Sequence, residues 1–398
     1  MFIHILDIEL NPFPRGMYTR KKMLKMKALI GLFFLLSFQI NAQPPQISTN
    51  NAPLNGTFIQ HIEVNMDSLQ IREEINPSDD ANEKLEIRNL EKDINDYKTI
   101  RTQTKSNAYA RSPSEGAQRL LDKNVQEIQT IAPESIEADI LYYDAGNYNA
   151  DRASALQSSL EKAAENEEAL TLWVANSLVV GDTTEAFATL KKMEALNYIP
   201  REVLCYAKDL YASVPKNAIL ITHGKWDTYG FVYEQMYGRD NQQILNVSLD
   251  LLQSPQYRKL LKRNGLMLPE GKRIDVEYFK ALCEINDERQ FAFSMTIPKE
   301  YLASFAKQMI PNGLVFLYPS SNEVDEVVAN NEAYLDSFLF MDCGQMENNS
   351  LVGLNANYLP MLMLLEQQYE SDKGSNVKLT QVQKHKEKLK RRIDKSPK

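Results

Sequence analysis

The sequence predicts an α/β protein in which a Rossmann-like three-layer domain with a parallel sheet follows an α-helical hairpin domain. Two observations predict this arrangement. After residue 217, short apolar runs alternate with helical segments, as in a parallel sheet whose crossover helices cover both faces. Before residue 217, apolar residues recur three or four positions apart in consecutive short segments, a spacing typical of amphipathic helices.

The clearest strand–crossover–strand unit spans 217–249. It reads Asn-Ala-Ile-Leu-Ile-Thr-His-Gly, then a polar loop and an aromatic-rich segment, and ends in Ile-Leu-Asn-Val-Ser-Leu. The same patterns predict strands at 218–222, 244–249, 291–297 and 313–318 and helices at 255–263, 275–284, 299–308, 325–338 and 357–370. We therefore assign 217–370 to the Rossmann-like domain.

The segment 114–216 is the predicted helical-hairpin domain. Its helices are expected at 135–145, 152–166, 168–180, 184–196 and 201–213. Gly146-Asn147 and Gly181-Asp182 stand 35 residues apart, and each follows an apolar helix. This spacing resembles tetratricopeptide hairpins, whose period is about 34 residues. The alternative is a generic helical bundle that caps the next domain.

Residues 43–113 are expected to form a flexible leader with an isolated helix. The stretch 43–57 is polar and rich in Pro and Asn, and 102–113 has the composition of a linker. Between them, Ile87, Leu90, Ile94 and Tyr97 fall at helical spacing.

The N-terminus predicts export. Residues 20–27 are basic, 28–40 are apolar, and Ala42 offers a small residue for cleavage, which together indicate a secretory signal peptide over 1–42. The apolar run is shorter than the roughly 20 residues that a membrane helix needs, although an uncleaved anchor is the alternative. Met17, Met23 and Met26 are further start candidates. The expected location is periplasmic or secreted.

The net charge of the chain limits the classes of partner that it can bind. Residues 1–42 carry six Lys or Arg and two acids, so the remaining chain has 39 Lys or Arg against 51 acids, a net charge of −12. An acidic surface argues against nucleic acid as a partner.

The cysteines Cys205, Cys283 and Cys343 show no Cys-x-x-Cys spacing. They are interpreted as small buried hydrophobes, and a pair in an exported protein is the alternative.

A short loop after the first predicted strand is the candidate ligand site. Its side chains are His223, Lys225, Trp226, Asp227 and Thr228. Ligands of open α/β sheets bind at the carboxyl ends of the strands. A histidine can act as a base or ligand, an indole can stack on a sugar, and a carboxylate can accept bonds from hydroxyl groups. The alternative is a capped turn, with Asp227 or Thr228 accepting amide hydrogens at a helix N-terminus.

The sequence predicts neither a catalytic residue, nor a cofactor, nor a metal site. A dinucleotide site needs a glycine-rich turn, but this loop has one glycine, Gly224. Histidines after residue 42 stand alone in three separate regions, at His61, His223 and His385, which argues against zinc.

The basic tail, 371–398, is the candidate partner-binding segment. Leu379, Val382, Leu389 and Ile393 follow a roughly helical spacing. The tail predicts an amphipathic helix that docks on an acidic protein or an anionic membrane surface, and a frayed terminus is the alternative. The cations proposed to contact the partner are Lys386, Lys388, Lys390, Arg391 and Arg392.

The region 217–370 resembles the soluble extracytoplasmic region of bacterial protein-O-mannosyltransferase-like membrane proteins. The residues that carry the resemblance are Ala218-Ile219-Leu220-Ile221-Thr222, Gly224, Asp227, Thr228, Tyr233, Gly238, Asn246-Val247-Ser248-Leu249, Phe291-Ala292, Thr296, Gly313-Leu314, 331–340 and 357–365. The family's loop carries Asp-Asn-Asp, whereas this chain has Lys225, Trp226 and Asp227. The membrane-embedded part of the family is also missing. The resemblance therefore implies a non-catalytic envelope domain.

The predicted function is that of an exported, non-catalytic protein-interaction or assembly factor of the bacterial cell envelope. Helical repeats usually present surfaces to protein partners, and the sheet domain lacks a catalytic motif. The alternative is a glycan-binding or glycan-processing protein that uses the 223–228 loop. A hydrolase with dispersed catalytic residues is a third alternative.

Overall fold

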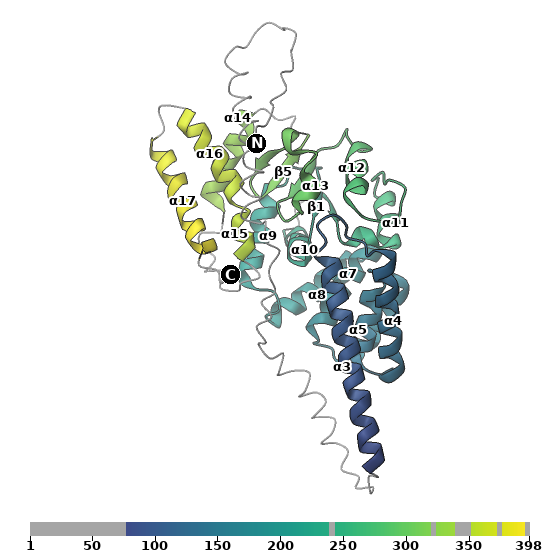
Figure 1. Cartoon of the computed structure of the whole chain (residues 1–398). Helices are drawn as coiled ribbons and strands as arrows, with labels where there is room; N and C mark the ends of the chain where they lie inside the picture. Colours follow the sequence, from purple (N-terminus) through teal and green to yellow (C-terminus); the bar gives the residue numbers. More distant parts are fainter. Residues whose placement is uncertain (1–76, 239–242, 320–323, 339–351, 372–375, 395–398) are drawn as a thin grey trace, which may run out of the picture. The chain divides into compact units, whose positions relative to one another are not determined.

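A computed structural model describes residues 77–238, 243–319, 324–338, 352–371 and 376–394 (Figure 1). They belong to one compact unit, Pro44–Lys398. The predicted signal peptide, 1–42, lies outside the described residues. Within the described ranges, no helix is both long enough and apolar enough to cross a membrane.

Consecutive helices form the part of the chain before the first strand. Polar side chains cap their N-terminal amides: Ser135 accepts from the Ala138 amide at 3.0 Å, and Asn166 accepts from the Ala169 amide at 2.9 Å. The helices are α3 (Pro77–Lys105), α4 (Glu115–Ile131), α5 (Ile136–Ala145), α6 (Ala153–Lys162), α7 (Glu167–Val180), α8 (Thr183–Ala195) and α9 (Arg201–Ser213). All five helices predicted at 135–213 are present, and the second ends four residues early.

Both predicted turns follow helices as expected, but the glycine adopts the left-handed conformation in only one of them. Gly181 is left-handed, with φ 87°, and the Asp182 amide donates to the Ser177 carbonyl. This is the C-terminal geometry that glycine favours. At the other turn, Gly146 is right-handed, and the left-handed residues are Asn147, with φ 51°, and Tyr148, with φ 63°.

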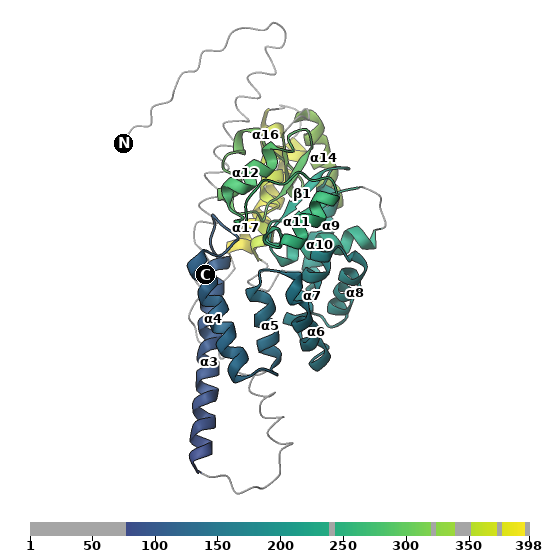
Figure 2. The same cartoon turned by 90° about the vertical axis from the view of Figure 1, so that its right-hand side faces the viewer.

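Helix α3 packs on the helical array, so the prediction that this helix is isolated is wrong, while the predicted flexible leader before residue 77 lies outside the described residues. Ile94 and Tyr97 of α3 are buried in one core cluster with Leu121 and Ile128 of α4 and Leu141 of α5. Both views show α3 running alongside α4 (Figures 1 and 2). The apolar spacing in α3 therefore marks a buried face, as in other amphipathic helices.

The five-stranded sheet is mixed. Its strands are β1 (Ile219–Thr222), β2 (Leu245–Ser248), β3 (Phe291–Ser294), β4 (Ile310–Asn312) and β5 (Val315–Tyr318), in the order β2-β1-β3-β5-β4. The predicted parallel pairing is present in the first half, because β1 runs parallel to β2 and to β3.

The prediction of a wholly parallel sheet is wrong for its second half. Strand β5 runs antiparallel to β3, and β4, which the sequence did not predict, runs antiparallel to β5. A tight turn at Gly313, with φ 59°, joins β4 to β5. Such a short turn can join only antiparallel strands, because a parallel pair needs a long crossover.

Helices lie on both faces of the sheet. Phe293 of β3 contacts Phe279 of α12 (Val276–Glu284), with ring centroids 5.5 Å apart. The next residue, Ser294, points to the opposite face and donates a hydrogen bond to Asp227 of α10 (Lys225–Tyr237). Helix α10 also packs against α9, where Ala207 leaves room for Gly230 but for no larger side chain.

The other helices of the sheet region either connect strands or follow the last strand. Helix α11 (Pro255–Arg263) follows β2, and the short α13 (Lys299–Leu302) precedes β4. Asn331 fixes the β4–β5 turn, because its side chain donates to the Pro311 carbonyl at 2.9 Å and accepts from the Gly313 amide at 2.7 Å. The remaining helices are α14 (Val324–Ser337), α15 (Val352–Ala356), α16 (Leu359–Ser371) and α17 (Asn376–Asp394).

The predicted linker, 102–113, is held in place by hydrogen bonds. Helix α3 extends to Lys105. Beyond it, the Arg111 amide donates to the Ile274 carbonyl at 2.7 Å, and the Val276 amide donates to the Tyr109 carbonyl at 3.2 Å. The Ile274 amide in turn donates to the Ser112 hydroxyl at 2.9 Å. This segment therefore joins the helical array to the chain that leads into α12.

Candidate functional site

The candidate site lies where the strand order reverses. After β1 the chain passes to β2 on one side of β1, and after β3 it passes to β4 and β5 on the other side, so the connections leave the adjacent carboxyl ends of β1 and β3 in opposite directions. Open α/β sheets bind ligands at such a point. The polar side chains gathered near these strand ends are Thr222, His223, Asp227, Thr228, Ser248, Asp250, Ser294 and Thr296.

His223 has both ring nitrogens engaged. Its Nδ1 lies 2.9 Å from the Thr296 carbonyl oxygen, and its Nε2 lies 2.8 Å from Nη1 of Arg111. A carbonyl only accepts and a guanidinium only donates, so the proton sits on Nδ1 and the ring is neutral. Burial lowers the pKa of His223, against the opposing effect of Asp250. The predicted base or ligand therefore has no free nitrogen lone pair.

The two amides that precede α10 bind carboxylates of the chain itself. The His223 amide donates to Asp227 Oδ2 at 3.0 Å, and the Gly224 amide donates to Asp250 Oδ2 at 2.8 Å. Helix N-termini attract anions because their amides lack partners and the helix dipole is positive there. Here Asp227 and Asp250 already supply the negative charge, which disfavours phosphate at this position.

Asp227 is a buried hub, and it is 2% exposed. Besides the His223 amide, the hydroxyls of Ser294 and Thr296 donate to its carboxylate at 2.8 and 2.9 Å. Asp227 does not cap α10 as predicted: the N-cap residue is Gly224, no side chain caps it, and the amide that Asp227 accepts, that of His223, precedes the helix. Burial raises the pKa of Asp227 to about 6, and these three hydrogen bonds oppose the shift.

Thr228 is buried against the strands. Its hydroxyl lies 3.0 Å from that of Thr222 and donates to Ser248 Oγ at 3.2 Å. Thr222 also donates to Asn246 at 3.0 Å. Thr228 thus ties α10 to β1 and β2 through hydroxyl bonds, and a ligand cannot reach its hydroxyl without displacing them.

Lys225 and Trp226 are the more exposed members of the predicted loop. The Lys225 ammonium lies 4.2 Å from the centre of the Trp226 ring, a cation–π distance, and 3.6 Å from Glu167 of α7. One face of the half-buried indole is therefore covered by a lysine that is itself paired. Stacking on a sugar would have to use the other face.

Arg111 is the member of this site that the sequence did not predict. It is 7% exposed, and its guanidinium donates to the Lys105 carbonyl at 3.2 Å and to the Asn107 carbonyl as well as to His223. It thus binds the carbonyls at the end of α3, where a cation is favoured. No sequence motif marks it, because the partners lie up to 112 residues away.

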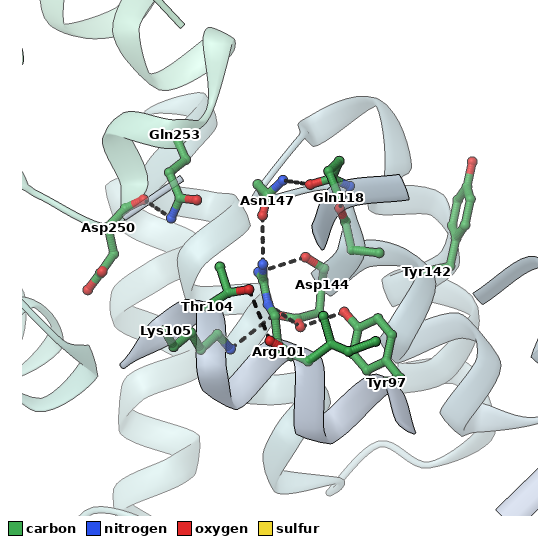
Figure 3. Close-up of polar contacts among 12 residues, drawn as sticks. Tyr97, Arg101, Thr104, Lys105, Gln118, Tyr142, Asp144, Asn147, Asp250 and Gln253 are labelled. Carbon is green, nitrogen blue, oxygen red and sulfur yellow. Dashed lines mark hydrogen bonds and ion pairs between the residues drawn. The ribbon is translucent and has the colours of Figure 1, made fainter. Parts of the chain in front are cut away.

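A second buried polar cluster lies inside the helical array (Figure 3). Arg101 of α3 forms an ion pair with Asp144 of α5, with Nε 2.8 Å from Oδ2. The Tyr97 hydroxyl donates to the same carboxylate at 2.7 Å, and Lys105 lies 3.2 Å away. Burial alone would raise the pKa of Asp144, but Arg101 and Lys105 more than offset it and hold the pKa well below its usual range.

The basic tail forms α17, so its fraying is not observed over 376–394. Val382 and Leu389 are fully buried, and α17 packs on α15 and α16, as Figure 1 shows. Lys386 forms an ion pair with Glu366 and is 14% exposed, and Lys390 pairs with Glu387 at 3.7 Å. Of the predicted contact residues, Lys388, Lys390 and Arg391 are solvent-exposed, while Lys386 and Arg392 are half-buried.

The described part of the chain holds no set of side chains suited to bind a metal ion. No group of three or more His, Cys, Asp or Glu side chains there could hold a metal ion. The hydrogen bonds that the strand-end side chains form are made within the chain.

The raised pKa of Asp227 predicts a pH-dependent stability. Its folded pKa of about 6 exceeds the ordinary 3.8, so the folded state binds a proton first, and stability from this group grows as pH falls from 7 to 4. We expect the unfolding free energy of the wild type, minus that of Asp227→Asn, to rise by roughly 2 to 3 kcal/mol over this range. Urea titrations of both proteins at each pH measure it. The opposite effect of His223 is common to both proteins and cancels, so a flat difference would contradict a raised pKa.

Comparison with known proteins gives no match to a family model, a curated protein or a solved structure. The resemblance of 217–370 to protein-O-mannosyltransferase-like proteins therefore stays a prediction.

Proposed function

We propose that this chain is an exported, non-catalytic protein-interaction or assembly factor of the bacterial cell envelope. In this proposal, the helices before residue 217 are tetratricopeptide-like and offer a surface to a protein partner. The sheet domain is Rossmann-like but serves as a scaffold.

The observation that carries the proposal is that the polar side chains of the strand-end site already form hydrogen bonds with other groups of the chain. His223 has both ring nitrogens bonded, and Asp227 accepts three hydrogen bonds from the chain itself. A general base or a ligand-binding carboxylate needs a free lone pair that faces the substrate. Saturated polar groups instead rigidify a core, which supports a scaffold role.

The helical array offers an exposed apolar side chain for a partner. Leu120 of α4 is 51% exposed, while its neighbour Leu121 is fully buried in the core. Helical repeats usually present an extended face to protein partners, and Leu120 lies on an exposed face of α4. Leu120 is therefore the position at which we expect a partner contact.

Crosslinking in intact cells, followed by purification of the tagged chain from solubilised envelopes, tests the proposal. We expect a reproducible protein partner whose yield falls in Leu120→Asp. The matched control is Val377→Asp, which makes the same change at a side chain of α17 that is 83% exposed. Deleting the tail is a poor test, because α17 buries Val382 and Leu389. Recovery of the chain alone from every sample would overturn the proposal.

Glycan binding by the 223–228 loop is the second candidate, and the half-buried Trp226 is the feature that favours it. Its test is Trp226→Ala. Glycan binding requires loss of retention on envelope polysaccharide with unchanged stability, whereas packing under Lys225 requires lower stability and no change in retention. The lysine over one ring face and its partner Glu167 favour the second outcome.

The cysteines offer a direct test of export. Cys205 is disulfide-bonded and Cys283 is a buried free thiol, so the interpretation of all three cysteines as unpaired is wrong for Cys205. Cys343 lies outside the described residues. Since a disulfide uses two of the three cysteines, we expect one reactive thiol per chain after denaturation without reductant. Disulfides persist in oxidising compartments, so three reactive thiols in protein taken from cells would argue against export.

A further inference from the structure

The segment 258–273 is basic, although the whole chain has a negative net charge: it holds six Lys or Arg and one acid, Glu270. Helix α11, which overlaps its start, is amphipathic. Tyr257 and Leu261 are buried, whereas Lys259, Lys262 and Arg263 are exposed. Positions three and four apart share one side of a helix. The three cations therefore form a single solvent-facing stripe.

These cations have no ionic partner within the described residues. Lys259, Lys262 and Arg263 take part in no ion pair there. By contrast, Arg258 turns inward, and its guanidinium donates to the Leu252 carbonyl at 2.6 Å and the Gln253 carbonyl at 3.1 Å. The stripe thus keeps its positive charge available to another molecule.

An apolar side chain is held outward beside the stripe. The turn after α11 closes at Gly265, with φ 81°, and the Leu266 amide donates to the Leu261 carbonyl at 3.0 Å. The next residue, Met267, is 58% exposed. Its amide donates to the buried Asn286 side chain at 3.1 Å, and its carbonyl accepts from the same side chain at 2.8 Å. The exposure of Met267 is therefore fixed by its backbone.

We propose that this patch, Lys259, Lys262, Arg263 and Met267, binds an anionic phospholipid surface. Lys and Arg near a membrane are attracted to acidic headgroups, and an adjacent apolar side chain adds favourable burial in the boundary region. The patch has both components. Asp287 and Glu288, which follow Asn286 in the chain, are exposed acids, so we assign the lipid contact to α11 and Met267 and not to that segment.

Helix α17 lacks the second component, which makes it a useful comparison. Lys384, Lys388 and Arg391 are exposed on it, but Val382 and Leu389 are buried inside the protein. It offers charge without an apolar contact. The lipid contact adds to the proposed protein partner and does not depend on it, because the two surfaces use different elements.

Sedimentation with lipid vesicles tests the proposal. The chain from residue 43 is used, since Pro44–Lys398 forms a compact unit. We expect binding to vesicles of phosphatidylglycerol and phosphatidylcholine, none to phosphatidylcholine alone, and weakening by salt. Lys262→Glu with Arg263→Glu should lower the partition coefficient at least about thirtyfold, since each basic residue near the lipid surface contributes about a fivefold attraction. Met267→Gln should lower it about threefold to tenfold at unchanged charge.

The matched control is Lys384→Glu with Lys388→Glu, which makes the same charge change on α17 and should lower partitioning less than about threefold. All the substituted side chains are exposed, and circular dichroism checks that each variant folds. Equal loss from both double variants would show unspecific attraction and overturn the proposal. Absence of vesicle binding, including the case in which the patch captures only an acidic protein, would overturn it as well.

Discussion

Asp144→Ala is expected to lower the unfolding free energy by about 3 to 5 kcal/mol, because it leaves the Arg101 guanidinium buried without its counter-charge. Arg101 has a side chain that is 6% exposed, and Asp144 one that is 8% exposed. The Tyr97 hydroxyl loses its acceptor in the same variant. Chemical denaturation of the two proteins measures the difference.

Two controls separate the ion pair from a general effect of removing an acid. Asp96→Ala removes an exposed carboxylate that pairs with Lys92 at 3.3 Å on the surface of the same helix, and it should cost less than about 0.5 kcal/mol. Replacing both Arg101 and Asp144 by apolar residues of similar volume should restore much of the loss, since no charge is then left unpaired. A single Asp144→Ala that costs less than the surface control would contradict this account of the cluster.

Arg111→Ala is expected to lower the unfolding free energy by about 2 to 4 kcal/mol. The guanidinium supplies hydrogen bonds to two carbonyls at the end of α3 and to the His223 ring. Without it, the two carbonyls and His223 Nε2 lose this donor, and the His223 ring keeps only its hydrogen bond to the Thr296 carbonyl. Thermal and urea unfolding of the variant measure the loss.

The matched control for this prediction is Arg119→Ala, which removes an exposed guanidinium from α4 and should change stability by less than about 0.5 kcal/mol. Arg111→Lys should retain the charge but lose the planar fork, and an intermediate loss is expected. If Arg111→Ala were as stable as Arg119→Ala, the hydrogen bonds between the helical array and the strand ends would contribute little.

Local patterns in the sequence predict most of the helices and four of the five strands, β1, β2, β3 and β5. Helices end where a residue accepts a left-handed conformation or caps an amide, and such residues are legible in sequence, as at Ser135, Asn166 and Gly181. The apolar runs 218–222 and 291–297 likewise mark strands that are buried on both faces.

The antiparallel hairpin was missed because its signal is short. Strand β4 has three residues, one of them Pro311, and proline argues against a strand wherever an amide donor is needed. The tight turn at Gly313 depends on Asn331 and Ser213, which accept the Gly313 and Leu314 amides and lie elsewhere in the sequence. Tertiary partners of this kind leave no local pattern.

The sequence predicts a polar loop after the first strand, and residues 223–228 do follow β1, but their hydrogen bonds depend on residues that periodicity cannot connect. The partners Ser294 and Thr296 of Asp227 come from the end of β3, 67 and 69 residues away. Arg111 fell in a segment that composition assigned to a linker. Composition indicates solubility and turn preference. It does not indicate which distant segment of the same chain will form hydrogen bonds with a polar segment.

Hydrogen exchange at the His223 and Gly224 amides tests most directly whether the strand-end site is occupied by the chain's own carboxylates. The two amides donate to Asp227 and Asp250 at 3.0 and 2.8 Å, so we predict slow exchange, comparable to that of the central strands, with no change when inorganic phosphate or a nucleotide is added. Rapid exchange of both amides, or protection that appears only with an added anion, would show an open ligand site and contradict the scaffold account.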